Sequence, residues 1–220
     1  MAWVREAAGA GAVSGRLGNA VYAQTMSGTV VRSLPGYRPK RTAAQDAHAW
    51  RMTVVHAAWL ALTDEEFEAW QAYALAQMVR NPQTGGLRKP SAYNLFSGLA
   101  IKYLQIHGGH AVPTLPPTGR FLGDLLTPTV TGGSGELVLH AEGSNAPGVL
   151  TELLAQLLPN PRNAPKAKSY VSLGFYRFED GAPIAVPVEG AGTYACAIRF
   201  VESATGRMTE MYPIGRATVA

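Results

Sequence analysis

The chain is poor in cysteine and in charge, and it has no long apolar run. Cys196 is the single cysteine among 220 residues, so an intrachain disulfide is excluded. No stretch approaches the roughly 18 apolar residues that a membrane-spanning helix needs. The first 15 residues carry charges of both signs and lack the apolar segment of a secretory signal. We therefore expect synthesis in a cytoplasm without secretory export, and no membrane partner.

Charged residues are few and unevenly distributed. They make up 15% of the chain, below the ~25% that is typical of globular domains, which predicts a surface partly buried against neighbouring subunits. Residues 1–51 hold seven Arg or Lys and two acids, a net charge of +5, whereas residues 111–220 hold eight bases and nine acids, a net charge of −1. The basic N-terminal segment is suited to nucleic acid, an anionic surface or an acidic patch on a neighbouring subunit.

Residues 1–41 are predicted to form an extended, glycine-rich basic arm. The segments 19–24 and 29–34 are rich in Val, Tyr and Thr and flank the sequence TMSG, which predicts a β-hairpin. A lone two-stranded hairpin is only marginally stable in water, so we expect the arm to lie on a body or on another subunit. The Pro-containing basic stretch 34–41 is predicted to connect it to the next domain. Four apolar and three basic residues are expected to form the arm's interface: Val21, Tyr22, Val30, Val31, Arg32, Arg38 and Arg41.

Residues 42–110 are predicted to form a helical domain of three helices. Thr42 and Thr63 each begin a T-x-x-Q or T-x-x-E pattern, which is typical of a capping box at a helix start. A third helix is expected to begin at Ser91 and to end before Gly108. The first two helices follow one another closely and predict an αα-hairpin with aromatic side chains at its seam. Residues 81–90 are predicted to be a polar loop.

The tryptophans of this domain are interpreted as core residues. Trp50, Trp59 and Trp70 recur among apolar positions at helical spacing. A base-stacking platform is the alternative interpretation, and the spacing favours the core.

The sequence HAVPTLPPTG predicts a proline-rich linker at 111–119, and residues 120–220 are predicted to form an antiparallel β-sandwich. Turn sequences separate six candidate strands at the spacing of a sandwich. These strands cover residues 128–132, 136–142, 169–178, 183–188, 193–202 and 207–219. The leucine-rich segment 148–162 fits a short helix by period but also fits a buried strand. The predicted fold class is therefore α+β, with an arm, a three-helix unit and a sandwich.

No pattern in the chain predicts catalysis or a bound cofactor. His107 and His110 could supply two metal ligands, but a helix-end turn explains them better because no complete ligand set accompanies them. The acidic residues 64–66 lie at the start of a helix, where the helix dipole favours negative charge. Cys196 alternates with Tyr194 and Ile198 and is predicted to be a small buried side chain. We expect no catalytic, cofactor or metal site and a protein that is not an enzyme.

Two resemblances extend this interpretation. The C-terminal half resembles a fibronectin type III-like sandwich, because a proline-rich entry precedes about seven short strands and a Tyr-alternating penultimate strand. The N-terminal half, over residues 8–107, resembles a family of virion structural components of tailed phages and prophages. The motifs that carry this resemblance are G-x-x-G-x-x-V from Gly15, G-x-x-V-R from Gly28, T-x-x-Q from Thr42, W-x-x-L-T from Trp59, W-x-x-Y-A from Trp70 and YNLF from Tyr93. The chain departs from the family's usual asparagine-rich spacing before the T-x-x-Q motif.

The resemblance implies a phage structural protein, a capsid or tail component that assembles as a homo-oligomer through its arm and helical body. Its partners would be copies of itself and other virion proteins, and its location the virion. A nucleic-acid-associated protein that binds phosphates through the basic arm is the first alternative. A carbohydrate-binding or adhesive module on the sandwich is the second.

Overall fold

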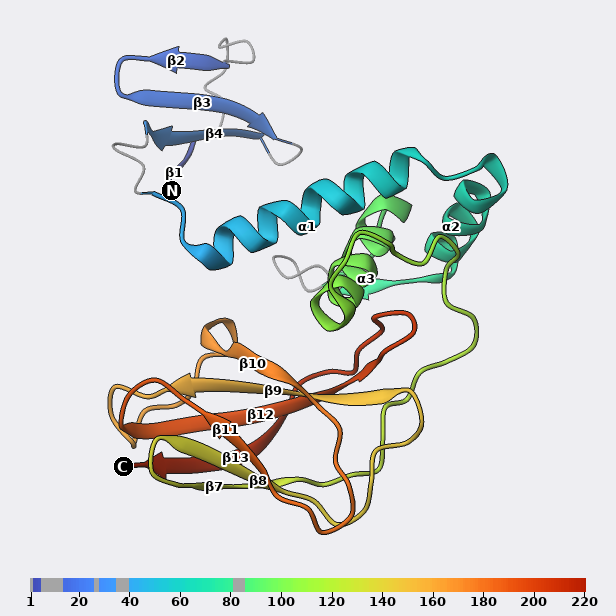
Figure 1. Cartoon of the computed structure of the whole chain (residues 1–220). Helices are drawn as coiled ribbons and strands as arrows, with labels where there is room; N and C mark the ends of the chain where they lie inside the picture. The colour runs from blue at the N-terminus through green and yellow to red at the C-terminus, as the bar shows by residue number, and fades with distance from the viewer. Residues whose placement is uncertain (1, 5–13, 26–27, 35–39, 81–85) are drawn as a thin grey trace. The chain divides into compact units, whose positions relative to one another are not determined.

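The computed structural model describes residues 2–4, 14–25, 28–34, 40–80 and 86–220. The chain divides into two compact units, Met1–Asp46 and Ala47–Ala220, which we call the arm unit and the body. The fold class is α+β, as predicted: three α-helices accompany antiparallel sheets, including those of a C-terminal β-sandwich (Figure 1).

The arm unit contains a four-stranded antiparallel sheet. Its strand order is β1 (Ala2–Val4), β4 (Gly28–Ser33), β3 (Ala20–Thr25) and β2 (Gly15–Leu17). The predicted hairpin is its centre, with β3 and β4 paired along their full lengths. The two outer strands were not predicted, because three residues are too few to show an alternating pattern. Residues 26–27 of the hairpin turn and 35–39 of the connector, Arg38 among them, lie outside the described residues.

The three predicted helices are present, and each begins where its capping residue predicts. They are α1 (Ala43–Leu60), α2 (Asp64–Ala76) and α3 (Ala92–His107). Thr42 exchanges hydrogen bonds with Gln45, and Thr63 does so with Glu66, which completes both capping boxes. The Ser91 hydroxyl accepts from the Asn94 amide, and the chain leaves α3 at Gly108, whose φ is +65°.

The helices surround a small aromatic core. Val55, Trp70 and Phe96 are fully or nearly fully buried at its centre. Trp59 contacts Phe96 at 5.2 Å between ring centroids, and it also meets Phe67 across the α1–α2 seam. The core prediction is wrong for Trp50, which is 40% exposed. The buried face of α1 runs through Val55 instead, and the Trp50 ring packs edge-on against His110.

A short two-stranded ladder follows α2. Strand β5 (Val79–Arg80) pairs antiparallel with β6 (Leu87–Arg88). The intervening residues 81–85 of the predicted polar loop lie outside the described residues. The predicted loop therefore has a short sheet at its base.

The C-terminal part of the body is a seven-stranded β-sandwich. One sheet has the order β11 (Ile184–Pro187), β8 (Glu136–His140), β7 (Thr129–Gly132). The other has the order β10 (Val171–Tyr176), β9 (Val149–Leu157), β12 (Gly192–Glu202), β13 (Tyr212–Val219). In the constant-type immunoglobulin sandwich the fourth strand joins the sheet of the first two. Here the fourth strand, β10, pairs with the third, β9, as in a fibronectin type III-like sandwich.

Strand β9 and the Tyr194 corner show how the sandwich sequence folds. The leucine-rich segment is the central strand β9, whose residues 151–155 are all buried, so its helical leucine spacing is overridden by burial on both faces. The Tyr194 hydroxyl donates to the carbonyl of Glu189 at 2.6 Å, with the carbonyl of Gly190 2.9 Å away. A tyrosine at the start of the penultimate strand that bonds back to the preceding corner is typical of immunoglobulin-like sandwiches.

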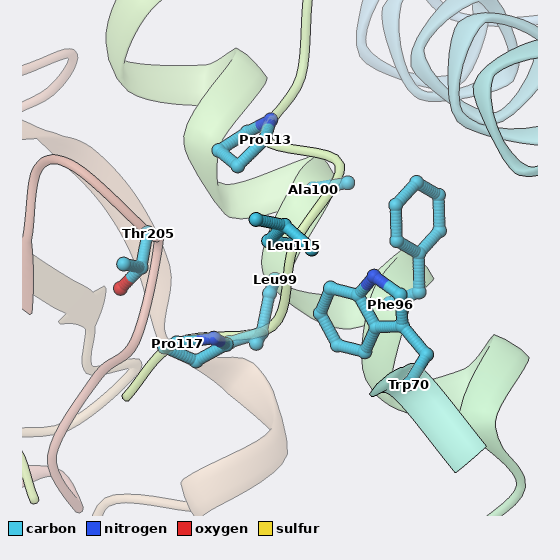
Figure 2. Close-up of a pocket in the computed structure, with 8 residues that line it drawn as sticks. All are labelled: Trp70, Phe96, Leu99, Ala100, Pro113, Leu115, Pro117 and Thr205. Atoms are coloured by element: carbon cyan, nitrogen blue, oxygen red, sulfur yellow. The ribbon is translucent and has the colours of Figure 1, made fainter. Parts of the chain in front are cut away.

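The proline-rich segment 111–119 lies against the helices. The Trp70 indole N–H donates to the Thr114 carbonyl at 2.7 Å. Pro113, Leu115 and Pro117 line a narrow crevice of about 10 Å³ together with Trp70 and, from the β12–β13 loop, Thr205 (Figure 2). The linker thus contributes to the packing of the body.

Candidate assembly surfaces

The strand register of the arm divides its predicted interface residues between two faces. Paired residues of neighbouring strands lie on one face of a sheet, and successive residues of a strand alternate between faces. Val21 is paired with Arg32 on β4 and with Arg16 on β2, and Ala23 is paired with Val30, so these five share a face. Tyr22 and its partner Val31 lie on the opposite face. We call the first the basic face and the second the aromatic face.

The basic face has an apolar centre with a cation on each side. Val21, Ala23 and Val30 are half-buried, whereas Arg16 and Arg32, on the two strands that flank Val21, are exposed. Thr29 is the one buried residue among those described in the arm unit. The buried clusters of the sandwich and of the helices both lie in the body. The arm sheet is therefore a two-sided sheet whose described side chains, apart from Thr29, remain at least partly accessible. Arg41, on the connector, forms a 3.9 Å exposed pair with Asp46.

An open apolar groove lies on the sandwich, beside the start of β13. Its volume is about 840 Å³. The segment 122–128 forms one wall, and Tyr212 to Ile214 of β13 form the other, over core residues Ile198 and Phe200. Leu122 and Leu125 are 86% and 97% exposed, and Tyr212 is 54% exposed. Two leucines and a tyrosine exposed together on the rim of one groove form an apolar patch, and such patches are typical of a contact site on a protein surface.

The groove wall is held in place by hydrogen bonds and by core packing. The Asp124 carboxylate accepts from the Ala146 backbone N–H at 2.8 Å and from the Asn145 amide at 3.2 Å. Leu126, two residues further on, is buried in the sandwich core. With Asp124 and Leu126 anchored, Leu122 and Leu125 are displayed outward from a fixed backbone. A preformed wall lowers the ordering cost of binding.

A second groove, of about 1040 Å³, opens between the edge strands β10 and β11. Val171 and Leu157 are its exposed apolar residues. The loop that follows β9 borders it through Gln156, which accepts from the Lys166 backbone N–H. This loop carries three exposed bases, Arg162, Lys166 and Lys168. The two grooves therefore differ in the charge of their surroundings.

The helices and the sandwich are joined by a buried ionic cluster. Lys102 on α3 donates to both carboxylate oxygens of Glu152 on β9, at 3.1 Å each. Arg199 on β12 donates to the same carboxylate at 2.5 Å. Glu152 is fully buried and Lys102 is 6% exposed. We call Lys102, Glu152 and Arg199 the ionic joint, because it links helix α3 to the strands of the sandwich through residues 50 apart in the chain.

The charge state of this joint follows from its surroundings. Burial alone would raise the pKa of Glu152, but hydrogen bonds from Arg199 and Ser172 and the charge of Lys102 hold that pKa below its usual value. Burial lowers the pKa of Lys102, and the charge of Glu152 only partly offsets this. One carboxylate thus interacts with two cations, which favours its ionised form in the folded body.

The other titratable residues that the sequence suggested as candidates for chemistry pack or form hydrogen bonds within the fold. The His107 ring nitrogen Nε2 lies 2.7 Å from the Ser203 carbonyl, and the ring stacks on Tyr103. The Glu66 carboxylate caps α2. Cys196 is buried in β12, and burial raises the pKa of its thiol to about 11. In the described part of the chain no group of three or more His, Cys, Asp or Glu is arranged to hold a metal ion.

Comparisons with protein-family models, with curated proteins and with solved structures found no match to this chain. None of the three described helices has the length and apolar content that a bilayer crossing needs. Sequence reasoning missed the groove and the ionic joint. The leucines at 122 and 125 look like core residues in a sequence, and a lysine paired with a glutamate 50 positions away leaves no local pattern.

Proposed function

We propose that this chain is a non-enzymatic structural subunit that assembles with copies of itself through its arm. The observation that carries the proposal is the arm sheet. Its four strands present both faces, with a single buried residue among those described, while the body has complete cores of its own. A small sheet without a core gains stability when one face is covered by another surface.

The surroundings of the polar residues support a structural rather than a catalytic role. Glu66 caps a helix, Glu152 joins two layers, and Cys196 is a core residue whose raised pKa disfavours the reactive thiolate. On the sandwich, the large exposed apolar residues other than Met208 lie at the two grooves, as expected of a protein that binds other proteins.

The particle to which we assign the subunit is a phage virion, as a capsid or tail component. This part of the proposal rests on the resemblance of residues 8–107 to phage structural proteins. A fibronectin type III-like sandwich attached to an assembling helical body suits such a component, because the sandwich can face outward or bridge to another layer. Its partners would then be its own copies and other virion proteins after synthesis in the host cytoplasm.

Phosphate binding by the arm is the competing proposal. The exposed Arg16 and Arg32 on either side of Val21 form a cationic strip that could contact a nucleic-acid backbone. Such binding would weaken steeply with salt and would not depend on the apolar residues of the face.

The test is the solution mass of the full chain, by light scattering coupled to size exclusion, beside a variant that lacks residues 1–41. Both buried clusters lie in the remaining chain, so this variant is expected to fold. We expect the full chain to exceed its monomer mass of 23.3 kDa and the variant to match its own monomer mass. Equal association of both would refute the role of the arm. The competing proposal makes a different prediction. It would be supported if the full chain were monomeric and bound a labelled DNA duplex in low salt, and if the Arg16→Gln/Arg32→Gln variant no longer bound that duplex.

A further inference from the structure

The proposed arm-mediated assembly requires an acceptor surface, and the body displays two grooves. An acceptor for the basic face must match it in three respects. It must offer apolar side chains opposite Val21, Ala23 and Val30, it must carry acids opposite Arg16 and Arg32, and it must be accessible without unfolding.

The apolar requirement is met by Leu122, Leu125 and Tyr212. Their side chains are 86%, 97% and 54% exposed on the rim of an 840 Å³ groove. Small side chains such as valine and alanine fit beneath and between larger ones at a packed interface, and burying each exposed leucine is favourable. The wall that carries both leucines is fixed by the hydrogen bonds of Asp124, so the surface exists before a partner arrives.

The charge requirement favours this groove over the other one. Asp124 is part of its lining, and Glu210 lies two residues before Tyr212 in the chain. Glu142 precedes Gly143, which packs beside Leu126, and Arg120 is the one base within three residues of the 122–128 wall. Acids thus outnumber bases at this groove. The groove between β10 and β11 has one acid in its lining, Glu189, but the loop beside it carries Arg162, Lys166 and Lys168, so bases outnumber acids there and disfavour a basic arm.

We propose that the groove formed by residues 122–128 and β13 is the acceptor for the basic face of the arm of a second copy of this chain. The inference rests on the proposed assembly function and adds the location of its contact. The arm of one subunit would cover Leu122 and Leu125 of the next with Val21 and Val30, while Arg16 and Arg32 face Glu210 and Asp124. Because donor and acceptor are different surfaces, the contact is heterologous, and it forms rings or open chains of subunits.

The test uses two full-length variants, each defective in one surface. Arg16→Gln/Arg32→Gln removes the charge of the arm and leaves the groove intact. Leu125→Lys/Glu210→Lys makes the groove basic and leaves the arm intact; both residues are exposed, so the fold is expected to be retained. Each variant alone should associate at least about tenfold more weakly than the natural chain, because the first lacks the cations that face the groove and the second repels the natural basic arm.

Mixing the two variants gives the decisive result. The intact arm of the groove variant can bind the intact groove of the arm variant, so the mixture should form a 1:1 complex of twice the 23.3 kDa chain mass. Such a complex, absent from either variant alone, supports the inference. A mixture that remains monomeric, or one that forms large polymers like the natural chain, overturns it.

The outcomes also separate this inference from the proposed function. If the arm variant loses association and the groove variant keeps it, the arm docks elsewhere, so the inference fails while arm-mediated assembly stands. If neither variant loses association, both fail. The matched control is Leu60→Lys, which places the same charge on an exposed leucine at the end of α1 (72% exposed). It should associate like the natural chain, and an equal loss there would overturn the inference by showing that any added surface charge disrupts assembly.

Discussion

The ionic joint leads to a testable prediction about the free energy of unfolding. One substitution in the joint should lower it, and a second substitution should restore part of the stability that the first removes. In Glu152→Gln the carboxylate is lost, and the buried Lys102 is left without its counter-charge. Removing one member of a buried ion pair costs about 3–5 kcal/mol, because the remaining charge stays desolvated. For a unit the size of the body this corresponds to a fall in melting temperature of roughly 10 °C.

Lys102→Met should cost less, about 1.5–3 kcal/mol, because Arg199 still neutralises Glu152. The double variant Lys102→Met/Glu152→Gln should be more stable than Glu152→Gln alone, since it removes the uncompensated lysine. If the double variant were instead less stable than both single ones, the desolvated-charge account would be wrong. A Glu152→Gln variant within 0.5 kcal/mol of the natural chain would contradict it as well.

The chain provides natural probes for both sides of this joint. All four tryptophans lie at positions 3, 50, 59 and 70, so their fluorescence reports on the N-terminal half. The single cysteine, Cys196, lies buried in the sandwich, so thiol labelling during urea unfolding reports on that domain. We expect the two transitions to coincide in the natural chain and to separate in Glu152→Gln, because the joint couples the two layers.

Four further outcomes are expected. Acidification should destabilise the body, because the pKa of Glu152 is lower in the folded chain than in the unfolded chain. The contribution of Glu152 to stability is present above its unfolded pKa and is lost as the pH falls through its folded pKa. Urea unfolding along a pH series measures this loss. Thr63→Ala should cost about 1 kcal/mol in urea unfolding, since it removes a capping box. Tyr194→Phe should cost about 1–3 kcal/mol by losing its corner hydrogen bond, whereas the exposed Tyr212→Phe should be nearly neutral. Native Cys196 should resist alkylation at pH 8 and react at once in denaturant, because its pKa is about 11 and its side chain is buried; rapid native labelling would contradict this.

The features that the sequence predicts well are the locally determined ones. The helix starts at Thr42, Thr63 and Ser91 depend on hydrogen bonds within four residues, so a short pattern predicts them. The six candidate strands of the sandwich are bounded by turn sequences in the same way. The sequence of strand β9 fits both a helix and a strand, because both faces of the strand are buried and burial removes the alternation of polar and apolar residues that marks a strand.

The features that sequence reasoning missed depend on tertiary context. The exposure of Trp50 is decided by which face of α1 meets the core, and that depends on Phe96, about fifty residues away. Of the predicted arm interface, the structure assigns Val21, Val30 and Arg32 to one face and Tyr22 and Val31 to the other. That division needs the strand register, which the hydrophobic pattern of a two-sided sheet specifies weakly.

The loop between β12 and β13 has a consequence for how this sandwich can diversify. In related sandwiches the loops at one end vary freely and carry binding specificity. Here a Cβ on Gly206, whose φ is +75°, would lie 2.3 Å from the Leu99 carbonyl of α3, so any side chain at this loop tip would push the helix away. Insertions and reporter tags should therefore be tolerated at the opposite end, in the exposed loop 159–168. A fluorescent label or affinity peptide placed there would leave both the joint and the groove beside β13 undisturbed.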